Sequence, residues 1–265
     1  MITDHFPMLK GLILDMDGVL WHDNKPLGNL PGIFDQIQDL GLDFVLATNN
    51  SAKTIEEYQE KLAGFGVVVK PERILTSAVA TFFIVRNSHP GKHLIYIVGS
   101  QSFEKDARKR GFEVLPEGDK RQADMVIVGL DQKLTYSKID YASRQVRSGA
   151  EFIATNTDAT YPTPNGLAPG AGSMVAAIQT AAGKEPLVIG KPSPAMYIQA
   201  MKVMGLTADQ VLCVGDRLET DILGAHRGGF HSAFLLSGVS TLEDLSKSDL
   251  QPDIIAENLT VLING

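Results

Sequence analysis

The sequence predicts an α/β fold in which a doubly wound parallel sheet is interrupted by a second, smaller α/β domain. Two observations lead to this prediction. Short apolar runs alternate with segments of helical spacing, and the stretch between the second and third of these runs is far longer than one crossover connection requires. Alternating strands and helices are typical of βαβ units, which assemble into parallel sheets. We therefore expect a Rossmann-like core sheet with an inserted lobe.

Three apolar runs rich in Val, Ile and Leu define the core sheet, because strands that are buried on both faces have this composition. They cover residues 12–14, 44–47 and 211–214, and each ends in polar residues. Helical spacing of apolar residues follows them at 32–40, 54–63 and 219–226. In open parallel sheets the carboxyl ends of the strands border one crevice. The polar residues after these three runs are therefore expected to lie close together.

The stretch between Thr48 and Lys191 is too long for one βαβ unit, which needs only about thirty residues. It has apolar runs and helical patterns of its own, so we expect a lobe with a separate core. Residues 157–172 lack periodicity and predict a long ordered loop. The expected domains are a core of residues 1–81 and 184–265 and an insert of residues 82–183. Within the insert, the predicted strands cover 94–98, 125–128 and 152–154, and the predicted helices cover 102–110, 136–147 and 174–182.

The composition excludes several classes of protein. Hydrophobic residues make up 44% and charged residues 21% of the chain, as in ordinary globular proteins. A net charge of -7 without a basic cluster argues against nucleic acid or an anionic membrane as the partner, so the ligand is expected to be small. No apolar run of about 18 residues could cross a membrane, and the N-terminal segment has no signal-peptide pattern. Because the one cysteine, Cys213, cannot form an internal disulfide, we expect a cytoplasmic protein.

Asp15 and Asp17 follow the first predicted strand, and Gly18 allows the chain to turn sharply after them. Alternation along a strand would place both carboxylates on the same side. Two carboxylates so close repel each other, which predicts a metal ion or a shared proton. Oxygen ligands suit Mg²⁺, and the sequence offers no nitrogen or sulfur set nearby. A D-x-D pair by itself is also typical of a solvated turn.

Two more aspartates follow the third predicted strand. Asp216 could complete a magnesium site. Asp221 lies at the start of the next predicted helix, where an acidic residue also interacts favourably with the helix dipole. We favour a role for Asp221 outside the metal's direct ligands, in which it positions Asp216 or the waters on the metal.

Neutral and basic groups follow other apolar runs. Thr48, Asn49 and Asn50 offer a hydroxyl, amides and backbone N–H groups that could hold phosphoryl oxygens, although Asn50 or Ser51 could instead cap a helix. A lysine is most often a solvated surface charge. Lys191, however, lies in the chain between Gly190 and a proline that stiffens the backbone. It could therefore be a fixed cation that faces the carboxylates.

Four segments together carry a resemblance to a known family. The chain resembles the haloacid dehalogenase superfamily of phosphotransferases, because the segments occur in that family's order. The position of the insert makes it most similar to the NagD-like branch (class IIA), whose members carry an α/β cap between the second and third segments. Residues 17–21, 154–158 and 169–173 are similar to that branch as well. The four segments are Asp15-x-Asp17-Gly18, Thr48-Asn49-Asn50, Gly190-Lys191-Pro192 and Gly215-Asp216-x-x-x-Thr220-Asp221.

The resemblance implies a role for each of these residues. Asp15 would attack phosphorus to form an aspartyl-phosphate, and Asp17 would protonate the leaving oxygen and later activate water. Magnesium would be held by the Asp15 carboxylate, the Asp17 carbonyl and Asp216. Thr48, Asn49, Asn50 and Lys191 would bind the phosphoryl oxygens. The dehalogenases of the superfamily lack the second aspartate, so Asp17 favours phosphate chemistry.

The expected function is that of a magnesium-dependent phosphatase acting on small phosphorylated metabolites. One alternative is a phosphotransferase or mutase that passes the phosphoryl group to a second substrate. Another is a non-catalytic phosphoacceptor module that binds magnesium. The cap would select substrates through Asn156 and Asp158, although both residues could equally cap a turn. A homodimer formed through the cap is a further expectation from the resemblance.

Two weaker signals are interpreted as structural. His89 and His93 have H-x-x-x-H spacing, but Pro90-Gly91 between them excludes the helix that would direct both rings at one zinc ion. We assign them to a turn. Trp21 is interpreted as a packing residue that could border the entrance to the site.

Overall fold

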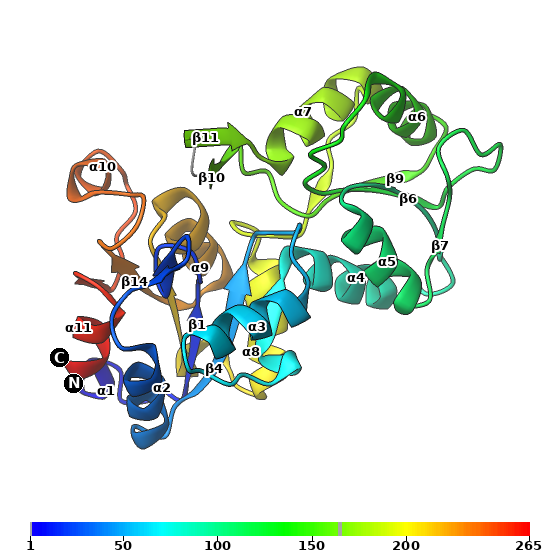
Figure 1. Cartoon of the computed structure of the whole chain (residues 1–265). Helices are drawn as coiled ribbons and strands as arrows, with labels where there is room; N and C mark the ends of the chain where they lie inside the picture. The colour runs from blue at the N-terminus through cyan, green and yellow to red at the C-terminus, as the bar shows by residue number, and fades with distance from the viewer. Residues whose placement is uncertain (1, 164–165) are drawn as a thin grey trace. The chain divides into compact units, whose positions relative to one another are not determined.

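The computed structural model describes residues 2–163 and 166–265. The chain forms two compact units. The core unit comprises the residues up to Thr48, Ile55–Leu75 and Lys191–Gly265, and the insert unit comprises Asn49–Thr54 and Thr76–Gly190. Figure 1 shows the helices and strands of both units coloured along the chain.

The core unit is built on a six-stranded parallel sheet with the order β15-β14-β13-β1-β4-β5. Strand β1 and its neighbour β13 are central, and the order runs outward from them in both directions, as in a doubly wound fold. The three predicted core strands are confirmed as β1, β4 and β13. The strand bounds are β1 Gly11–Leu14, β4 Asp43–Thr48, β5 Ile74–Thr76, β13 Val211–Gly215, β14 His231–Leu235 and β15 Ile254–Ala256.

Two of the three helices predicted for the core unit, at residues 32–40 and 54–63, form close to their predicted positions. Helix α2 (Leu30–Asp39) begins at Asn29, whose side chain accepts a hydrogen bond from the Gly32 N–H, and it buries Leu30, Ile33 and Ile37. These residues share one hydrophobic cluster with Leu12 and Leu14 of β1. The other helices are α1 Ile2–His5, α3 Ile55–Gly64, α8 Pro194–Met204, α9 Leu223–Gly228, α10 Leu242–Ser246 and α11 Leu259–Asn264.

The insert unit has its own five-stranded sheet, in the order β12-β9-β8-β6-β7, and every pairing in it is parallel. Its predicted strands and helices are confirmed, and a separate hydrophobic cluster fills its core. The strands are β6 Leu94–Val98, β7 Glu113–Val114, β8 Met125–Val128, β9 Glu151–Ala154 and β12 Leu187–Val188. The helices are α4 Ser77–Ser88, α5 Gln101–Lys109, α6 Tyr136–Arg147 and α7 Ala171–Ala182.

The prediction of a long loop over residues 157–172 is partly wrong. Strands β10 (Thr160–Thr163) and β11 (Gly166–Pro169) form an antiparallel pair in it. Each of these strands contains a proline, and proline argues against a strand in sequence reasoning because it cannot donate to the ladder. A second small pair, β2 (Trp21–His22) and β3 (Lys25–Pro26), follows the first core strand.

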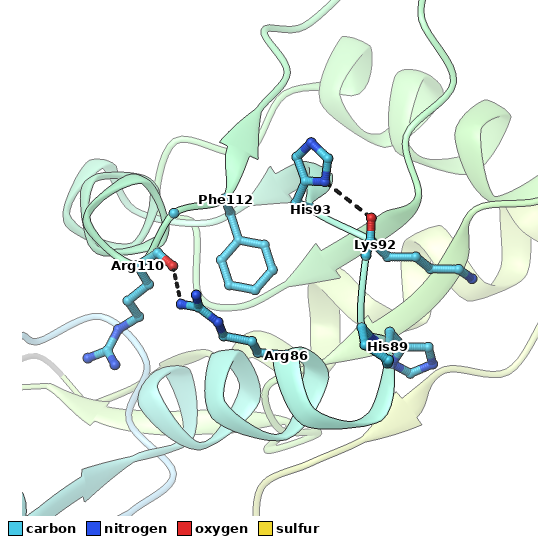
Figure 2. Close-up of a pocket in the computed structure, with 9 residues that line it drawn as sticks. Arg86, His89, Lys92, His93, Arg110 and Phe112 are labelled. Atoms are coloured by element: carbon cyan, nitrogen blue, oxygen red, sulfur yellow. Dashed lines mark hydrogen bonds between the residues drawn. The ribbon is translucent and has the colours of Figure 1, made fainter.

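The two histidines of the insert unit lie in a turn, as predicted. Helix α4 ends before His89, whose Nε2 lies 2.6 Å from a carboxylate oxygen of Glu151. The His93 ring is engaged elsewhere, with Nδ1 3.2 Å from the Gly91 carbonyl oxygen (Figure 2). The turn lines a hollow of about 330 Å³ beside Arg86 and Phe112. Because the two rings have different partners, they do not form a metal site together.

Across the residues that the structure describes, every helix is too short or too polar to span a membrane.

Candidate active site

The carboxyl ends of three adjacent core strands carry the polar residues singled out in the sequence. Asp15 follows β1, Thr48 is the last residue of β4, and Asp216 follows β13. The Asp15 N–H donates to the Val214 carbonyl oxygen at 2.9 Å, so the backbone pairing continues one residue beyond the strand. Because β1 pairs with both β4 and β13 in parallel, these three positions lie at one edge of the sheet.

Lys191 links this edge together. Its ammonium donates to Asp15 Oδ1, to Asp221 Oδ1 at 2.6 Å and to the Ala47 carbonyl oxygen at 3.1 Å. The side chain is buried, with 3% of the residue exposed. Burial alone would lower the pKa of Lys191, but the two carboxylates outweigh it and raise the pKa above its ordinary value. Lys191 is therefore a fixed cation and not a solvated surface charge.

Three buried carboxylates surround this single cation. One oxygen from each of Asp15, Asp216 and Asp221 lies within 4.8 Å of the others. Burial raises the pKa of Asp15 well above its ordinary value, against the opposing effect of Lys191. Burial and the nearby Asp221 raise the pKa of Asp216 from 3.8 to about 6. Arg217 also acts on Asp216 and lowers its pKa, but two cations cannot neutralise three carboxylates, so the cluster lacks positive charge.

The hydrogen bonding of the Asp216 carboxylate suits a divalent cation in this cluster. Its Oδ2 accepts a hydrogen bond from the Val239 N–H at 2.7 Å, whereas its Oδ1 is buried and has no hydrogen-bond partner within the described part of the chain. Buried polar atoms are nearly always paired in folded proteins. Carboxylate oxygens are the donors that Mg²⁺ prefers, so the orphaned oxygen and the charge deficit both suit this ion.

Two glycines make room for Asp216. A Cβ atom at Gly238 would lie 1.9 Å from Asp216 Oδ2, and one at Gly18 would lie 2.5 Å from the same oxygen. Gly18 also has a φ of +87°, which side chains rarely adopt. The glycine after the D-x-D pair therefore serves the turn and the close approach of a third aspartate.

Asp221 is held from several directions. It lies in a π-helical turn (Leu218–Ile222) that precedes α9, in place of the α-helix that the sequence predicted from residue 219. Its Oδ2 accepts from the Arg217 N–H at 3.2 Å, and its carbonyl oxygen accepts from the Tyr197 hydroxyl at 3.1 Å. Short π-turns occur often at functional sites. Here the turn presents Asp221 to Lys191 as well as to the other two aspartates.

The second aspartate of the D-x-D pair has a different environment. Strand β1 ends at Leu14 and the chain turns at Met16, whose carbonyl oxygen accepts from the Leu20 N–H at 2.8 Å. The alternation of a strand therefore does not apply to Asp17. Its carboxylate is exposed and accepts, through Oδ1, a hydrogen bond of 2.8 Å from the Trp21 indole N–H.

The remaining predicted residues belong to the insert unit. The Asn49 amide donates to Asp158 Oδ1 at 3.0 Å, and the Asn156 amide donates to the Asn49 carbonyl oxygen at 2.7 Å. Asn156 Oδ1 accepts from the Asp158 N–H at 3.1 Å, which is the turn-capping contact that the sequence allowed. Asn50 Oδ1 accepts from the Ala52 N–H at 2.8 Å. Asn49, which directly follows Thr48 in the chain, thus forms one network with Asn156 and Asp158.

Several contacts of the site were not predicted from the sequence. Ser237 donates to the Gly18 carbonyl oxygen at 2.7 Å, and Tyr197 supports Asp221. Ser237 follows the apolar run of β14, so the rule that found Asp15 and Asp216 could have found it too. The sequence contains no comparable signal for Tyr197, which lies within a helix among apolar residues.

Comparisons with known proteins agree with this arrangement. A family model described as Haloacid dehalogenase-like hydrolase matches residues 12–113, and a second model, described as HAD-hydrolase-like, matches residues 188–262. An acid sugar phosphatase from Staphylococcus aureus is 32% identical over 254 residues, which cover 96% of each chain.

Two solved structures are similar over nearly the whole chain. NagD from Escherichia coli K-12 has 33% identity and a TM-score of 0.86, and the match covers 95% of this chain and 97% of NagD. A glycerol phosphate phosphatase from Mycobacterium tuberculosis, solved in complex with magnesium, has 31% identity and a TM-score of 0.88. That match covers 97% of this chain and 77% of the other.

Proposed function

Because the chain belongs to the haloacid dehalogenase superfamily, in its NagD-like family of phosphatases, we propose that it hydrolyses small phosphoric monoesters through an aspartyl-phosphate on Asp15. The observation that carries this proposal is the cluster of Asp15, Asp216 and Asp221 around Lys191. It combines a buried nucleophile, a fixed cation and a set of oxygen ligands at one edge of a parallel sheet.

Asp15 is the proposed nucleophile. A carboxylate oxygen of Asp15 forms a bond to phosphorus while the bond from phosphorus to the ester oxygen breaks. Lys191 donates to Asp15 Oδ1, which fixes the orientation of the carboxylate and favours its ionised form. Asp17 gives a proton to the leaving oxygen, and it later takes one from the water that attacks the aspartyl-phosphate and releases inorganic phosphate.

Asp15, Asp216 and the Asp17 carbonyl would hold magnesium, with Asp221 as a supporting residue. When bound, this ion offsets the negative charge that the carboxylates and the phosphate bring together. Lys191 and Thr48 are proposed to bind the phosphoryl oxygens, together with Asn49 and Asn50, which follow Thr48 in the chain. Preorganised donors of this kind supply most of the catalysis in phosphoryl transfer.

The names of the relatives support small sugar or polyol phosphates as substrates. We propose that the inserted cap of residues 82–183 selects among them through Asn156 and Asp158. Asp158 contacts the side chain of Asn49, which directly follows Thr48, so a change at Asp158 can be transmitted to that segment. Dimer formation through the cap remains a separate proposal, which sizing the protein in solution would test.

The decisive experiment measures inorganic phosphate released from 4-nitrophenyl phosphate, glycerol phosphate and a panel of sugar phosphates. Activity should require added Mg²⁺, disappear with a chelator and need no second substrate. Asp15→Asn should abolish turnover, whereas Asp39→Asn, a change at an exposed aspartate on α2, should have no effect. Full activity in excess chelator would exclude the metal. Phosphate release only with an added acceptor would identify a transferase, and unchanged turnover by Asp15→Asn would indicate a phosphoacceptor module with another role.

A further inference from the structure

We infer that Trp21 is a positioning residue for the proton transfer, because its indole N–H occupies one oxygen of Asp17 and leaves the other oxygen to exchange the proton. This inference rests on the proposed function, in which Asp17 is the acid and base. Its starting point is the hydrogen bond of 2.8 Å from Trp21 Nε1 to Asp17 Oδ1.

The turn that joins the two residues holds the indole in place. The Gly18 N–H donates to the Trp21 carbonyl oxygen at 2.8 Å, and Asp17 and Trp21 form an isolated backbone bridge. Trp21 then enters β2, where it pairs with Pro26 of β3. The backbone of Trp21 therefore contacts both Asp17–Gly18 and β3, so the position from which the indole ring extends is fixed.

The ring is also held by its neighbours. Trp21 is fully buried, with 0% of the residue exposed. Tyr58 stacks on it with ring centroids 6.4 Å apart, and Phe65 lies against it at 5.9 Å. The Lys61 ammonium lies over the ring, 4.1 Å from its centroid. A ring packed in this way has no other rotamer available at low cost, so the direction of its N–H bond is fixed.

This geometry distinguishes the two oxygens of Asp17. An indole N–H can only donate, so Asp17 Oδ1 must act as an acceptor in both the acid and the base form of the carboxyl group. Because the carbonyl oxygen of a carboxylic acid is a stronger acceptor than its hydroxyl oxygen, this bond favours the proton on Oδ2. The proton passes from Oδ2 to the leaving oxygen as the bond between phosphorus and that oxygen breaks, and Oδ2 later accepts a proton from the attacking water. Asp17 is otherwise exposed, so the indole restricts a side chain that would rotate freely in water.

The chain contains a single tryptophan, which permits a nearly isosteric test. Growth on β-(3-benzothienyl)alanine in a tryptophan auxotroph replaces the indole N–H of this residue alone by sulfur and keeps the shape of the ring. For glycerol phosphate, whose leaving group needs a proton, kcat/KM should fall about tenfold, because this ratio reports the formation of the aspartyl-phosphate. For 4-nitrophenyl phosphate, whose leaving group is acidic, kcat/KM should fall by less than about twofold. Trp21→Phe should show the same selectivity together with lower stability.

The matched control is Phe34→Leu, which weakens an aromatic contact with Phe44 at the same hydrophobic cluster and leaves the rings around Trp21 in place. It should lower the melting temperature and reduce kcat/KM for both substrates to the same small extent. Asp17→Asn provides the reference for the loss of the acid. If Asp17→Asn discriminates between the two substrates and the sulfur analogue does not, the role of Trp21 is overturned and the proposed function stands. If Asp17→Asn itself lowers kcat/KM equally for both substrates, the acid role in the proposed function fails, and the inference falls with it.

Discussion

The core unit and the insert unit differ in how their buried carboxylates are paired with cations. In the core unit, the buried carboxylates of Asp15, Asp216 and Asp221 outnumber the cations that act on them, since Lys191 pairs with both Asp15 and Asp221. In the insert unit, buried Asp131 has a cation of its own, Lys138, whose ammonium lies 2.6 Å from Asp131 Oδ2. The core unit therefore has an excess of buried negative charge, whereas the buried carboxylate of the insert unit is neutralised by its own lysine. Excess charge destabilises a fold, so we expect it where a metal ion and an anionic substrate are handled.

The largest effect that separates the two units is expected from Lys191→Met. The change leaves Asp15 and Asp221 buried without their cation and removes the donor proposed for the phosphoryl oxygens. We expect kcat to fall by about a thousandfold or more, as for the loss of a preorganised charged donor. Lys138→Met is the matched control, because it leaves the buried carboxylate of Asp131 in the insert unit without its partly exposed lysine partner. It should lower the melting temperature while kcat changes by less than about threefold. Similar losses of kcat in both variants would contradict the comparison.

Asp216→Asn should separate activity from stability. Asp216 is a proposed ligand of magnesium, so we expect its loss to lower kcat/KM by about a hundredfold or more. The metal-free protein should nevertheless become more stable, because the change removes a buried carboxylate whose pKa is raised to about 6. A shift of this size corresponds to about 2 to 3 kcal/mol of unfolding free energy at neutral pH. Denaturant unfolding in a chelator at pH 7 measures it, and a less stable variant would contradict the predicted charge excess.

The same carboxyl group predicts how the stability of the metal-free protein depends on pH. The pKa of Asp216 is about 6 in the folded protein and near its ordinary value of 3.8 in the unfolded chain. The folded state therefore binds the proton more tightly, so the contribution of Asp216 to stability decreases as the pH rises from about 4 to about 6. Melting temperatures of the wild type should fall over this range relative to those of Asp216→Asn. Saturating Mg²⁺ at pH 7 should reverse the loss. Parallel pH curves for the two proteins would exclude Asp216 as the source.

Three adjacent strands of the core sheet and the main strands and helices of the insert unit were predicted from the sequence, whereas β5, β14 and β15 of the core sheet were not. Strands buried on both faces, such as β1, β4 and β13, are continuous apolar runs, and the polar residues after them mark the carboxyl edge of the sheet. The pair β10–β11 was missed because both strands contain proline. Both outcomes have one cause. Local sequence pattern indicates which residues are buried and which conformation they favour, so it finds buried apolar strands and misses strands that contain proline.

The contacts that organise the site were less accessible. Lys191 could be a surface charge or a fixed cation until the structure placed it beside Asp15 and Asp221. The bond from Trp21 to Asp17 joins two residues only four apart, but it depends on the turn at Gly18, which directs a buried ring back to an exposed carboxylate. Sequence pattern specifies neither the direction of a side chain after a turn nor a contact between distant segments. The roles of Asn156 and Asp158 toward substrate stay predictions.

The smallest expected effect concerns the insert unit and asks whether its network acts on substrate choice or only on stability. Asp158→Ala removes the acceptor of the Asn49 amide but keeps the Asn156 side chain and its bonds to the Asn49 carbonyl oxygen and the Asp158 N–H. One lost hydrogen bond at a partly exposed site costs about 1 kcal/mol, so the fold should survive. If the network selects substrates, kcat/KM should change several-fold for some sugar phosphates, while slow turnover of 4-nitrophenyl phosphate and its magnesium dependence stay nearly constant.

Asn156→Ala is the control for stability, because it removes the turn-capping contact and the bond to the Asn49 carbonyl oxygen together. It should lower the melting temperature more than Asp158→Ala does. A uniform decrease for all substrates in Asp158→Ala, in proportion to its lower melting temperature, would assign Asp158 to the turn alone. A changed ranking of substrates with little change in melting temperature would instead place substrate choice in the insert unit. The chemistry proposed at Asp15 would be unaffected in either case, since the cluster of carboxylates on which it depends lies entirely in the core unit.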